Sequence, residues 1–406
     1  MRVDDIQVRP AGEEVELSAR VRRIPRGLPD RRIWYRFPAE LGPALVERAD
    51  PFLPALLFCA IAGREPLEIE GAVSKRLAAG AEKAMAIWRR WYALAPVPVS
   101  AALVSAESSE PQVTASFFSG GLDSFYTVLK NLGSPAGEPK VSELLFVWGL
   151  DIGLDNRELY RAVRGRLQAI ADGLGLRLVL ASTNLRELTD RFAAWGKHQF
   201  GAGLSSVALC LGRRLRRVYL PASYTFVHAH PWGSHPLLDP LWSTESLTVI
   251  HDGSEATRPE KARWQVGRSP LALEHLRVCF ENPGNAYNCG RCEKCLRTMV
   301  NLEVAGALDL CRTFDTPLDL DRLRRLTITS PHIRINYIDS LEHLDRHGGD
   351  PELRVALDAV LAKPTPVWHR VRDRVERLDL RFLGGRLRDL ARRRMIRRAR
   401  PGRLAG

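Results

Sequence analysis

Four short apolar segments alternate with helix-like segments between residues 113 and 221, and this alternation restricts the fold more than any other feature of the chain. The apolar segments are residues 113–118, 144–150, 176–181 and 218–221. Strands that are separated by helices pair in parallel, and the helices cover both faces of the sheet. The order of segments therefore predicts an α/β fold built on a doubly wound parallel sheet.

The first 110 residues carry a different pattern, which predicts a separate α+β domain. Apolar residues alternate over 15–21 and 33–37, as in a pair of strands, and residues 73–94 have apolar side chains at helical spacing. A polar segment at 105–112 marks the boundary. We therefore expect an N-terminal α+β domain, a nucleotide-binding domain with a cysteine cluster, a helical extension and an Arg-rich tail, at residues 1–110, 111–310, 311–369 and 370–406.

Composition is that of a globular protein. Hydrophobic residues make up 45% of the chain and charged residues 26%, which excludes a disordered chain. The longest apolar run, residues 51–63, is too short to span a bilayer, and the N-terminal residues lack the apolar core of a secretory signal. We expect a cytoplasmic protein without a transmembrane segment, assembled as a homo-oligomer.

Positive charge is concentrated at the C-terminal end. Residues 370–406 hold 14 Arg against 4 Asp and Glu, a net charge of +10 that leaves +3 of the total of +13 for the rest. Apolar residues at spacings of three and four predict basic amphipathic helices that break at Gly384–Gly385. Such helices are typical of segments that bind RNA or an anionic surface, whereas the body is not expected to bind nucleic acid.

A glycine-rich turn joins the first apolar segment to its helix. It consists of Ser119, Gly120, Gly121, Leu122, Asp123 and Ser124. The glycines let the backbone approach a ligand, and the amide groups at the start of a helix attract anions. Asp123 would repel a bare phosphate, so it indicates either a helix cap or a Mg²⁺ ion that bridges carboxylate and phosphate. The turn lacks the lysine of a Walker A loop.

The sequence SGGLDS at a strand-to-helix junction resembles the PP-loop of the ATP pyrophosphatase superfamily. The resemblance implies a sheet of the HUP (adenine nucleotide alpha hydrolase-like) type and ATP bound through its terminal phosphates at Ser119–Ser124 with Mg²⁺. It also implies cleavage of ATP to AMP and pyrophosphate. In this superfamily ammonia, an amine or sulfur then attacks the adenylated intermediate.

Further candidates follow the other strands. Asp151 and Asn184 come after the second and third apolar segments, and ligands of open parallel sheets bind at the carboxyl ends of strands. Both residues are therefore candidates for ATP binding. His198 is a further candidate at the same edge of the sheet, formed by the carboxyl ends of the strands. Residues 222–252 hold four histidines, which we interpret as hydrogen-bonded members of an ordered loop.

Four cysteines predict a metal centre. They are Cys279, Cys289, Cys292 and Cys295, and the last three are separated by two residues each. Four thiolates form a closed tetrahedral set for a structural Zn²⁺, and an iron–sulfur cluster is the alternative. The other three cysteines lie in apolar stretches and are interpreted as small buried hydrophobes.

The PP-loop and the cysteines together resemble the 7-cyano-7-deazaguanine synthase (QueC-like) family over residues 113–305. That family has one residue fewer between its first two cysteines and has no counterpart of residues 1–110 or 310–406. The resemblance implies an ATP-dependent C–N ligase that adenylates an acceptor for attack by ammonia or an amine. The catalytic residues would be Ser119, Asp123 and Lys261, since the family carries a lysine near this last position.

Two other functions remain open. A tRNA thiolation enzyme would share the PP-loop, but it predicts a basic body and a spare reactive cysteine. A non-enzymatic nucleotide-binding module of a multi-protein system, such as a defence system, predicts ATP binding without turnover.

Overall fold

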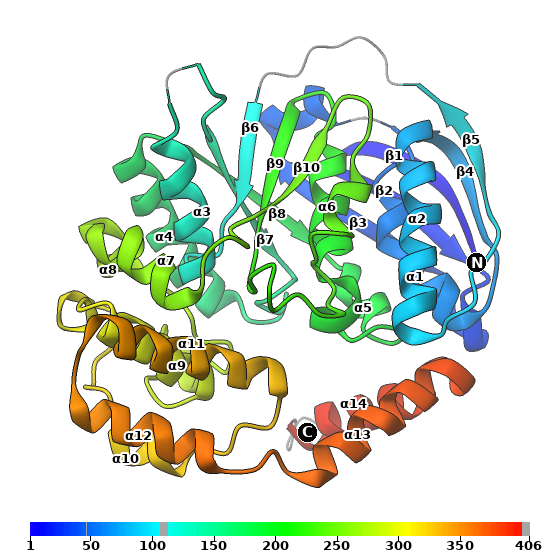
Figure 1. Cartoon of the computed structure of the whole chain (residues 1–406). Helices are drawn as coiled ribbons and strands as arrows, with labels where there is room; N and C mark the ends of the chain where they lie inside the picture. Colours follow the sequence, from blue (N-terminus) through cyan, green and yellow to red (C-terminus); the bar gives the residue numbers. More distant parts are fainter. Residues whose placement is uncertain (46, 106–112, 136, 400–406) are drawn as a thin grey trace, which may run out of the picture.

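One sheet runs through most of the chain. The structure is a computed structural model that describes residues 1–45, 47–105, 113–135 and 137–399. Its strands are β1 (Arg2–Ala11), β2 (Glu14–Arg22), β3 (Arg31–Pro38), β4 (Leu67–Ser74), β5 (Val99–Val104), β6 (Val113–Phe117), β7 (Glu143–Trp148), β8 (Arg177–Thr183), β9 (Leu215–Pro221) and β10 (Thr248–Asp252). They form a ten-stranded sheet in the order β10-β9-β6-β7-β8-β3-β2-β1-β4-β5 (Figure 1).

Helices connect the strands and continue to the C-terminal end. They are α1 (Phe52–Gly63), α2 (Lys75–Tyr92), α3 (Leu122–Leu132), α4 (Arg157–Leu174), α5 (Leu185–Thr189), α6 (Phe200–Cys210), α7 (Arg258–Trp264), α8 (Pro270–His275), α9 (Glu293–Val304), α10 (Leu320–Arg325), α11 (Pro331–His347), α12 (Pro351–Ala362), α13 (Val367–Leu378) and α14 (Arg386–Ala399). No helix among the described residues is long and apolar enough to cross a membrane.

Five strands, β6 to β10, form an entirely parallel block. Numbered from β6, their order across the sheet is 3-2-1-4-5, which is the order of a doubly wound sheet. The α/β class and the parallel strands predicted from sequence are therefore confirmed. Strand β10 was not predicted, because its five residues lie within a stretch rich in proline, glycine and histidine.

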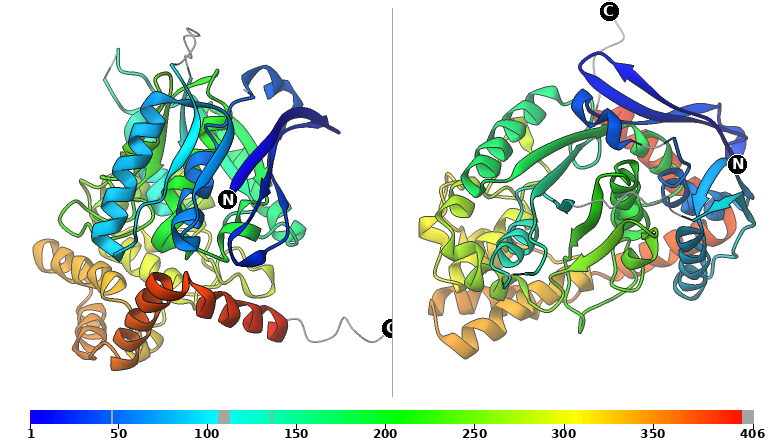
Figure 2. Two further views of the ribbon diagram at one scale, coloured as in Figure 1. Left: turned by 90° about the vertical axis from the view of Figure 1, so that its right-hand side faces the viewer. Right: turned by 90° about the horizontal axis from the view of Figure 1, so that it is seen from above.

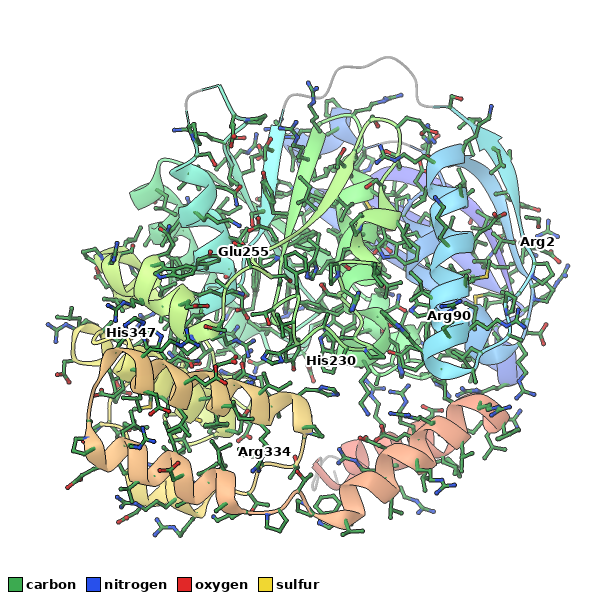
Figure 3. All side chains as sticks on the ribbon, viewed as in Figure 1. Arg2, Arg90, His230, Glu255, Arg334 and His347 are labelled. Carbon is green, nitrogen blue, oxygen red and sulfur yellow. The ribbon has the colours of Figure 1, made fainter. Side chains whose placement is uncertain are left out.

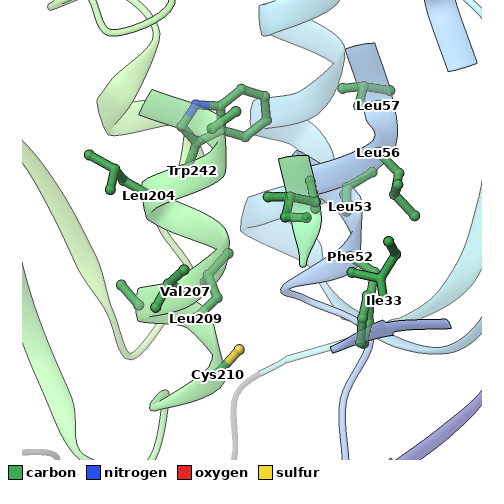
Figure 4. Close-up of a cluster of buried hydrophobic side chains, with 14 of the residues drawn as sticks. Ile33, Phe52, Leu53, Leu56, Leu57, Leu204, Val207, Leu209, Cys210 and Trp242 are labelled. Carbon is green, nitrogen blue, oxygen red and sulfur yellow. The ribbon is translucent and has the colours of Figure 1, made fainter. Parts of the chain in front are cut away.

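Both faces of this block are covered, as the apolar strands require. Successive residues of β7 alternate between the faces: Leu144 and Phe146 belong to one hydrophobic cluster, and Leu145 and Val147 belong to another. Helices α3 and α4 pack on the first face, and α1 and α6 pack on the second. Figure 4 shows part of the second cluster, where Val207 of α6 and Leu53 of α1 lie in one core.

The N-terminal strands extend the same sheet. Strand β3 pairs antiparallel with β8 through two residue pairs, Tyr35 with Thr183 and Arg36 with Ser182. Strand β1 was not predicted, because a shift in register between Asp4 and Gln7 interrupts its alternation. The predicted boundary at 105–112 lies, except for its first residue, outside the described residues. The division into domains stays a prediction.

The helices after residue 310 form two groups. Helices α10 to α12 pack with α9 around a third hydrophobic cluster, whose members include Val300, Tyr337 and Leu357. Helices α13 and α14 are joined by a turn at Gly384–Gly385, where the sequence predicts a break between helices. Figures 1 and 2 show both groups at the end of the molecule to which the carboxyl ends of the parallel strands point.

Two glycines in the middle of helices α2 and α4 allow the packing of these helices to be tested. A Cβ atom at Gly80 in α2 would overlap the carbonyl oxygen of Leu241, whereas a Cβ at Gly165 in α4 meets nothing within 4 Å. We expect Gly80→Ala to lower the free energy of unfolding by about 1–3 kcal/mol through overpacking. We expect Gly165→Ala to raise it by about 0.5–1 kcal/mol through helix propensity. Urea denaturation measures both values, and equal effects would contradict the close contact of α2 with Leu241.

Candidate functional site

A cavity of about 600 Å³ lies at the carboxyl ends of the parallel strands. Its wall includes Phe117 of β6, Val147 of β7 and Pro221 of β9. The chain leaves β6 toward β7 on one side and later returns to β9 on the other, so the cavity lies at the point where the strand order reverses. Ligands of open α/β sheets bind at such a switch point.

The predicted glycine-rich turn forms one wall of this cavity. Gly120 has a φ of +75°, which favours glycine, and its carbonyl accepts a hydrogen bond of 2.7 Å from the Arg277 amide. No side chain caps α3 at Gly121, so the amide groups of its first turn are open to an anion. Ser119 lines the cavity, and the Ser124 hydroxyl donates to the Gly121 carbonyl at 2.9 Å. Open amides at the start of a helix are groups that can bind an anion.

Asp123 is the centre of a partly buried ionic cluster. One carboxylate oxygen lies 2.8 Å from Arg258 Nη2, and the other lies 3.0 Å from Lys261 Nζ. Burial opposes ionisation of Asp123, but the charges of Arg258 and Lys261 outweigh it and hold its pKa well below the usual range. Lys261 Nζ also donates to the Ala222 carbonyl at 2.6 Å. The cluster therefore joins α3, α7 and the segment after β9.

The predicted site residues fall into two groups: those that line the cavity and those that do not. The cavity is lined by Ser119, Gly121, Leu122, Asp123, Ser124 and Asp151. Lys261 is 1% exposed and lies behind Asp123 without lining the cavity. The Asn184 side chain lies elsewhere, because its amide accepts from Trp34 N at 3.0 Å and donates to the Arg32 carbonyl at 2.9 Å on β3.

Three cationic side chains line the cavity: Arg258 of α7 and Lys294 and Arg297 of α9. Burial lowers the pKa of Lys294. Arg258 also donates to Asn336 of α11 at 2.7 Å, which fixes the guanidinium. Sequence reasoning assigned Lys294 and Arg297 no role here, although their spacing of three residues places them on one face of a helix. That spacing was the available signal.

Aromatic side chains form the remaining wall. Trp195, Phe200, Trp232 and Phe280 line the cavity together with aromatic and aliphatic residues of the strands. Gly196 allows Trp232 to lie close to the chain, because a Cβ at residue 196 would lie 2.9 Å from the indole. A flat, apolar ligand group would match these side chains.

The four predicted cysteines do form a group that can hold a metal ion. Their sulfur atoms all lie within 4.8 Å of one another, and the Cys279–Cys292 and Cys289–Cys295 pairs are 3.9 and 3.8 Å apart. Zinc–sulfur bonds of about 2.3 Å place the sulfurs of a tetrahedral set about 3.8 Å apart, so the donor set fits Zn²⁺. Backbone amides of Asn282, Cys292 and Cys295 donate to three of the sulfurs, which favours thiolates.

The cysteine group also positions the cavity. Cys292 caps the start of α9, and its sulfur accepts from the amide of Cys295 at 3.4 Å. Lys294 and Arg297 follow in the first two turns of the same helix. A metal at this group would therefore fix the direction in which both cations point.

The other cysteines are buried, as predicted. Burial raises the pKa of Cys59 to about 12 and raises that of Cys210 well above its usual value. Cys311 contacts the Thr313 hydroxyl at 3.4 Å. Among the described residues, the cysteines outside the metal group are thus in apolar surroundings that do not favour a thiolate.

Histidines of the loop 222–252 serve to hold it together. His251 lies between Asp239, at 2.7 Å, and Ser254, at 2.9 Å. This resembles a catalytic triad, but Ser254 is 2% exposed and donates to the Tyr224 carbonyl, so it is not accessible to a substrate. Figure 3 labels His230 facing the C-terminal helices, where its ring stacks on His332 at 3.4 Å between centroids.

His198, the remaining candidate at this edge of the sheet, is buried against Phe58. Its ring stacks on that of Phe58 at 4.7 Å, and its Nδ1 accepts from the Ala194 amide at 3.0 Å. Burial lowers its pKa well below the usual value. A neutral histidine in this position stabilises the segment that carries Trp195.

Comparison of the chain with models of protein families, with curated proteins and with solved structures found no match. The geometry of the cavity and of the cysteine group therefore carries the functional argument.

Metal content is the first test of the cysteine group. We expect one zinc ion per purified chain, and we expect a strong chelator to lower the melting temperature because the loop and the start of α9 lose their link. Cys292→Ser should lose the metal, whereas Cys59→Ala, at a buried cysteine outside the group, should keep it. Elemental analysis identifies the bound metal. Iron together with sulfide would indicate an iron–sulfur cluster instead of zinc.

The ionic cluster at Asp123 has a measurable effect on stability. Asp123→Asn leaves two buried cations without their counter-charge, so we expect the free energy of unfolding to fall by about 3 kcal/mol. The wild type should lose this contribution as the pH falls below about 4, because the folded pKa lies below the unfolded value, and the variant should not. Asp151→Asn, at an exposed residue of the same cavity, should change stability by less than about 0.5 kcal/mol. Urea denaturation over a pH series measures all three.

Proposed function

We propose that this chain is an ATP-dependent adenylating enzyme of the PP-loop type, which forms AMP and pyrophosphate. One observation carries the proposal: the turn SGGLDS opens, at the switch point of a 3-2-1-4-5 sheet, into a cavity with three cationic side chains. An open helix start and these cations together favour a polyphosphate.

The triphosphate would lie along the cationic side of the cavity. The terminal phosphates would accept from the first-turn amides of α3 and from the Ser119 hydroxyl. Arg258, Lys294 and Arg297 would contact the remaining phosphate oxygens. Arg258 is held in place by Asp123, and Arg297 is held by Glu293 at 3.3 Å, so these two side chains need little reorganisation.

Mg²⁺ would be held by phosphate oxygens and by the exposed carboxylate of Asp151 at the cavity wall. Asp123 fits this task less well than its place in the turn suggests, since both of its oxygens are paired with cations. When bound, the ion would neutralise phosphate charge. The role that we propose for Asp123 is to position Arg258.

The chemistry requires no nucleophile from the protein. An oxygen of the acceptor would attack the α-phosphorus, the bond from that phosphorus to the bridging oxygen would break, and pyrophosphate would leave. Ammonia or an amine would then displace AMP from the adenylated acceptor. The contribution of the chain is to align the two reactants and to stabilise the negative charge that develops on the phosphorus. The aromatic wall at Trp195 and Trp232 favours a planar acceptor.

The structure weighs against a sulfur relay. Thiolation through an enzyme persulfide needs an accessible cysteine, and the three cysteines outside the metal group are all buried. A binding module without turnover differs from the proposed enzyme only in its reaction, so product analysis separates the two.

Product analysis with Mg-ATP and a metabolite extract from the source organism tests the proposal. We expect AMP and pyrophosphate in equal amounts, and we expect Lys294→Gln and Arg297→Gln each to lower the rate by about 100-fold. Lys83→Gln, at an exposed lysine of α2, is the matched control and should leave the rate unchanged. Binding of a non-cleavable ATP analogue should weaken in the same two variants. Release of ADP and phosphate would reject the proposal, and tight binding without any turnover would favour the binding module.

A further inference from the structure

Helices α13 and α14 and the turn between them, called the C-terminal hairpin, expose an unusual amount of apolar surface. Half of the large apolar side chains that are exposed in the described chain belong to it. They are Val367, Trp368, Val371, Val375, Leu378, Phe382, Leu383, Leu387 and Leu390, each at least 46% exposed. So many exposed apolar side chains on two neighbouring helices are unusual for a soluble surface, so we expect them to have a cover.

The exposed side chains of α13 form one stripe. Val371, Val375 and Leu378 are spaced by four and three residues, which places them on one face of the helix. Asp373 and Glu376 lie on the opposite face, where both contact Lys197, at 3.0 and 2.8 Å. The apolar stripe therefore points away from the side that is bound to the body.

The hairpin is firmly attached on its other side. Its turn packs closely, because a Cβ at Gly384 would overlap the carbonyl oxygen of Ala62 in α1. In α14, Asp389 pairs with Arg191 at 3.4 Å and Arg392 pairs with Asp190 at 3.0 Å. These contacts hold both helices, so the stripe cannot be covered by turning inward without breaking them.

Arginines flank the stripe. Exposed arginines occur at 372, 374, 377, 381, 386 and 394. Around α13, Arg374 and Arg377 lie on one side of the stripe and Arg372 lies on the other. An apolar face with a cationic border on a helix that is too polar to cross a membrane is typical of an interfacial helix.

We propose that the α13–α14 hairpin lies flat on a membrane surface that contains anionic lipids. Acyl chains would cover the aliphatic stripe, and the bordering arginines would contact lipid phosphates. RNA would satisfy the arginines but would leave the valine and leucine side chains in water. A second copy of the chain would cover the stripe but would bring two rows of arginines together. Only an anionic membrane complements both features.

Membrane binding would place the cavity close to the lipid surface. Lys197, which holds α13, belongs to the same five-residue turn as Trp195 and Gly196, and these two line the cavity. This inference stands on the hairpin alone and does not depend on the proposed reaction.

Vesicle co-sedimentation of the full chain tests the proposal. We expect binding to phosphatidylcholine vesicles that contain phosphatidylglycerol, weaker binding as salt rises, and little binding to phosphatidylcholine alone. The triple variant Val371→Ser, Val375→Ser, Leu378→Ser should reduce binding by about tenfold or more, and so should Arg374→Gln with Arg377→Gln. Val355→Ser on α12, at a residue that is 59% exposed, is the matched control and should bind as the wild type does. Thermal melting verifies that each variant is folded.

The outcomes are distinct. Binding that tracks both the stripe and its arginines supports the proposal. Vesicle binding that survives the triple serine variant overturns it, as does binding of single-stranded RNA without binding to anionic vesicles. A dimer that the triple variant converts to a monomer would assign the stripe to a second copy and would also overturn the proposal.

Discussion

The ionic cluster of Asp123 with Arg258 and Lys261 holds the architecture of the site together. Through it, the helix after the glycine-rich turn, the helix α7 and the segment after β9 share one charge centre. Asn336 extends the contact to α11. Each charge here is removed from water at a cost that only its partners offset, so the cluster specifies one arrangement of these elements. The shape of the cavity depends on that arrangement.

The cysteine group supplies a second constraint on the cavity. The cysteine group fixes the start of α9, and α9 supplies Lys294 and Arg297 to the cavity. The two centres are unlike in chemistry, but both fix helices that carry positive charge toward the same space. The glycine-rich turn contributes the backbone amides at the start of α3. The positively charged groups of the cavity are therefore positioned by separate structural features.

Local pattern predicted much of this and missed what depends on distant contacts. The strands 113–118 and 144–150, the helix 73–94 and the cysteine group follow from periodicity and spacing, and the structure has them within a few residues. Strand β1 was missed because its bulge breaks the alternation. Lys261 was expected at the ligand, but its partner Asp123 is 138 residues away, and only the fold shows that it lies behind the carboxylate.

The short pairing between β3 and β8 has a consequence for any attempt to divide the chain. Only two residue pairs join these strands, aided by the side chains of Asn184 and Thr183. If the first hundred residues were removed, β8 would present a row of unpaired amides and carbonyls along an open edge, and such edges recruit strands from other molecules. The first hundred residues thus act as a permanent cap on the parallel block of the sheet, and a chain without them would tend to aggregate before its chemistry could be examined.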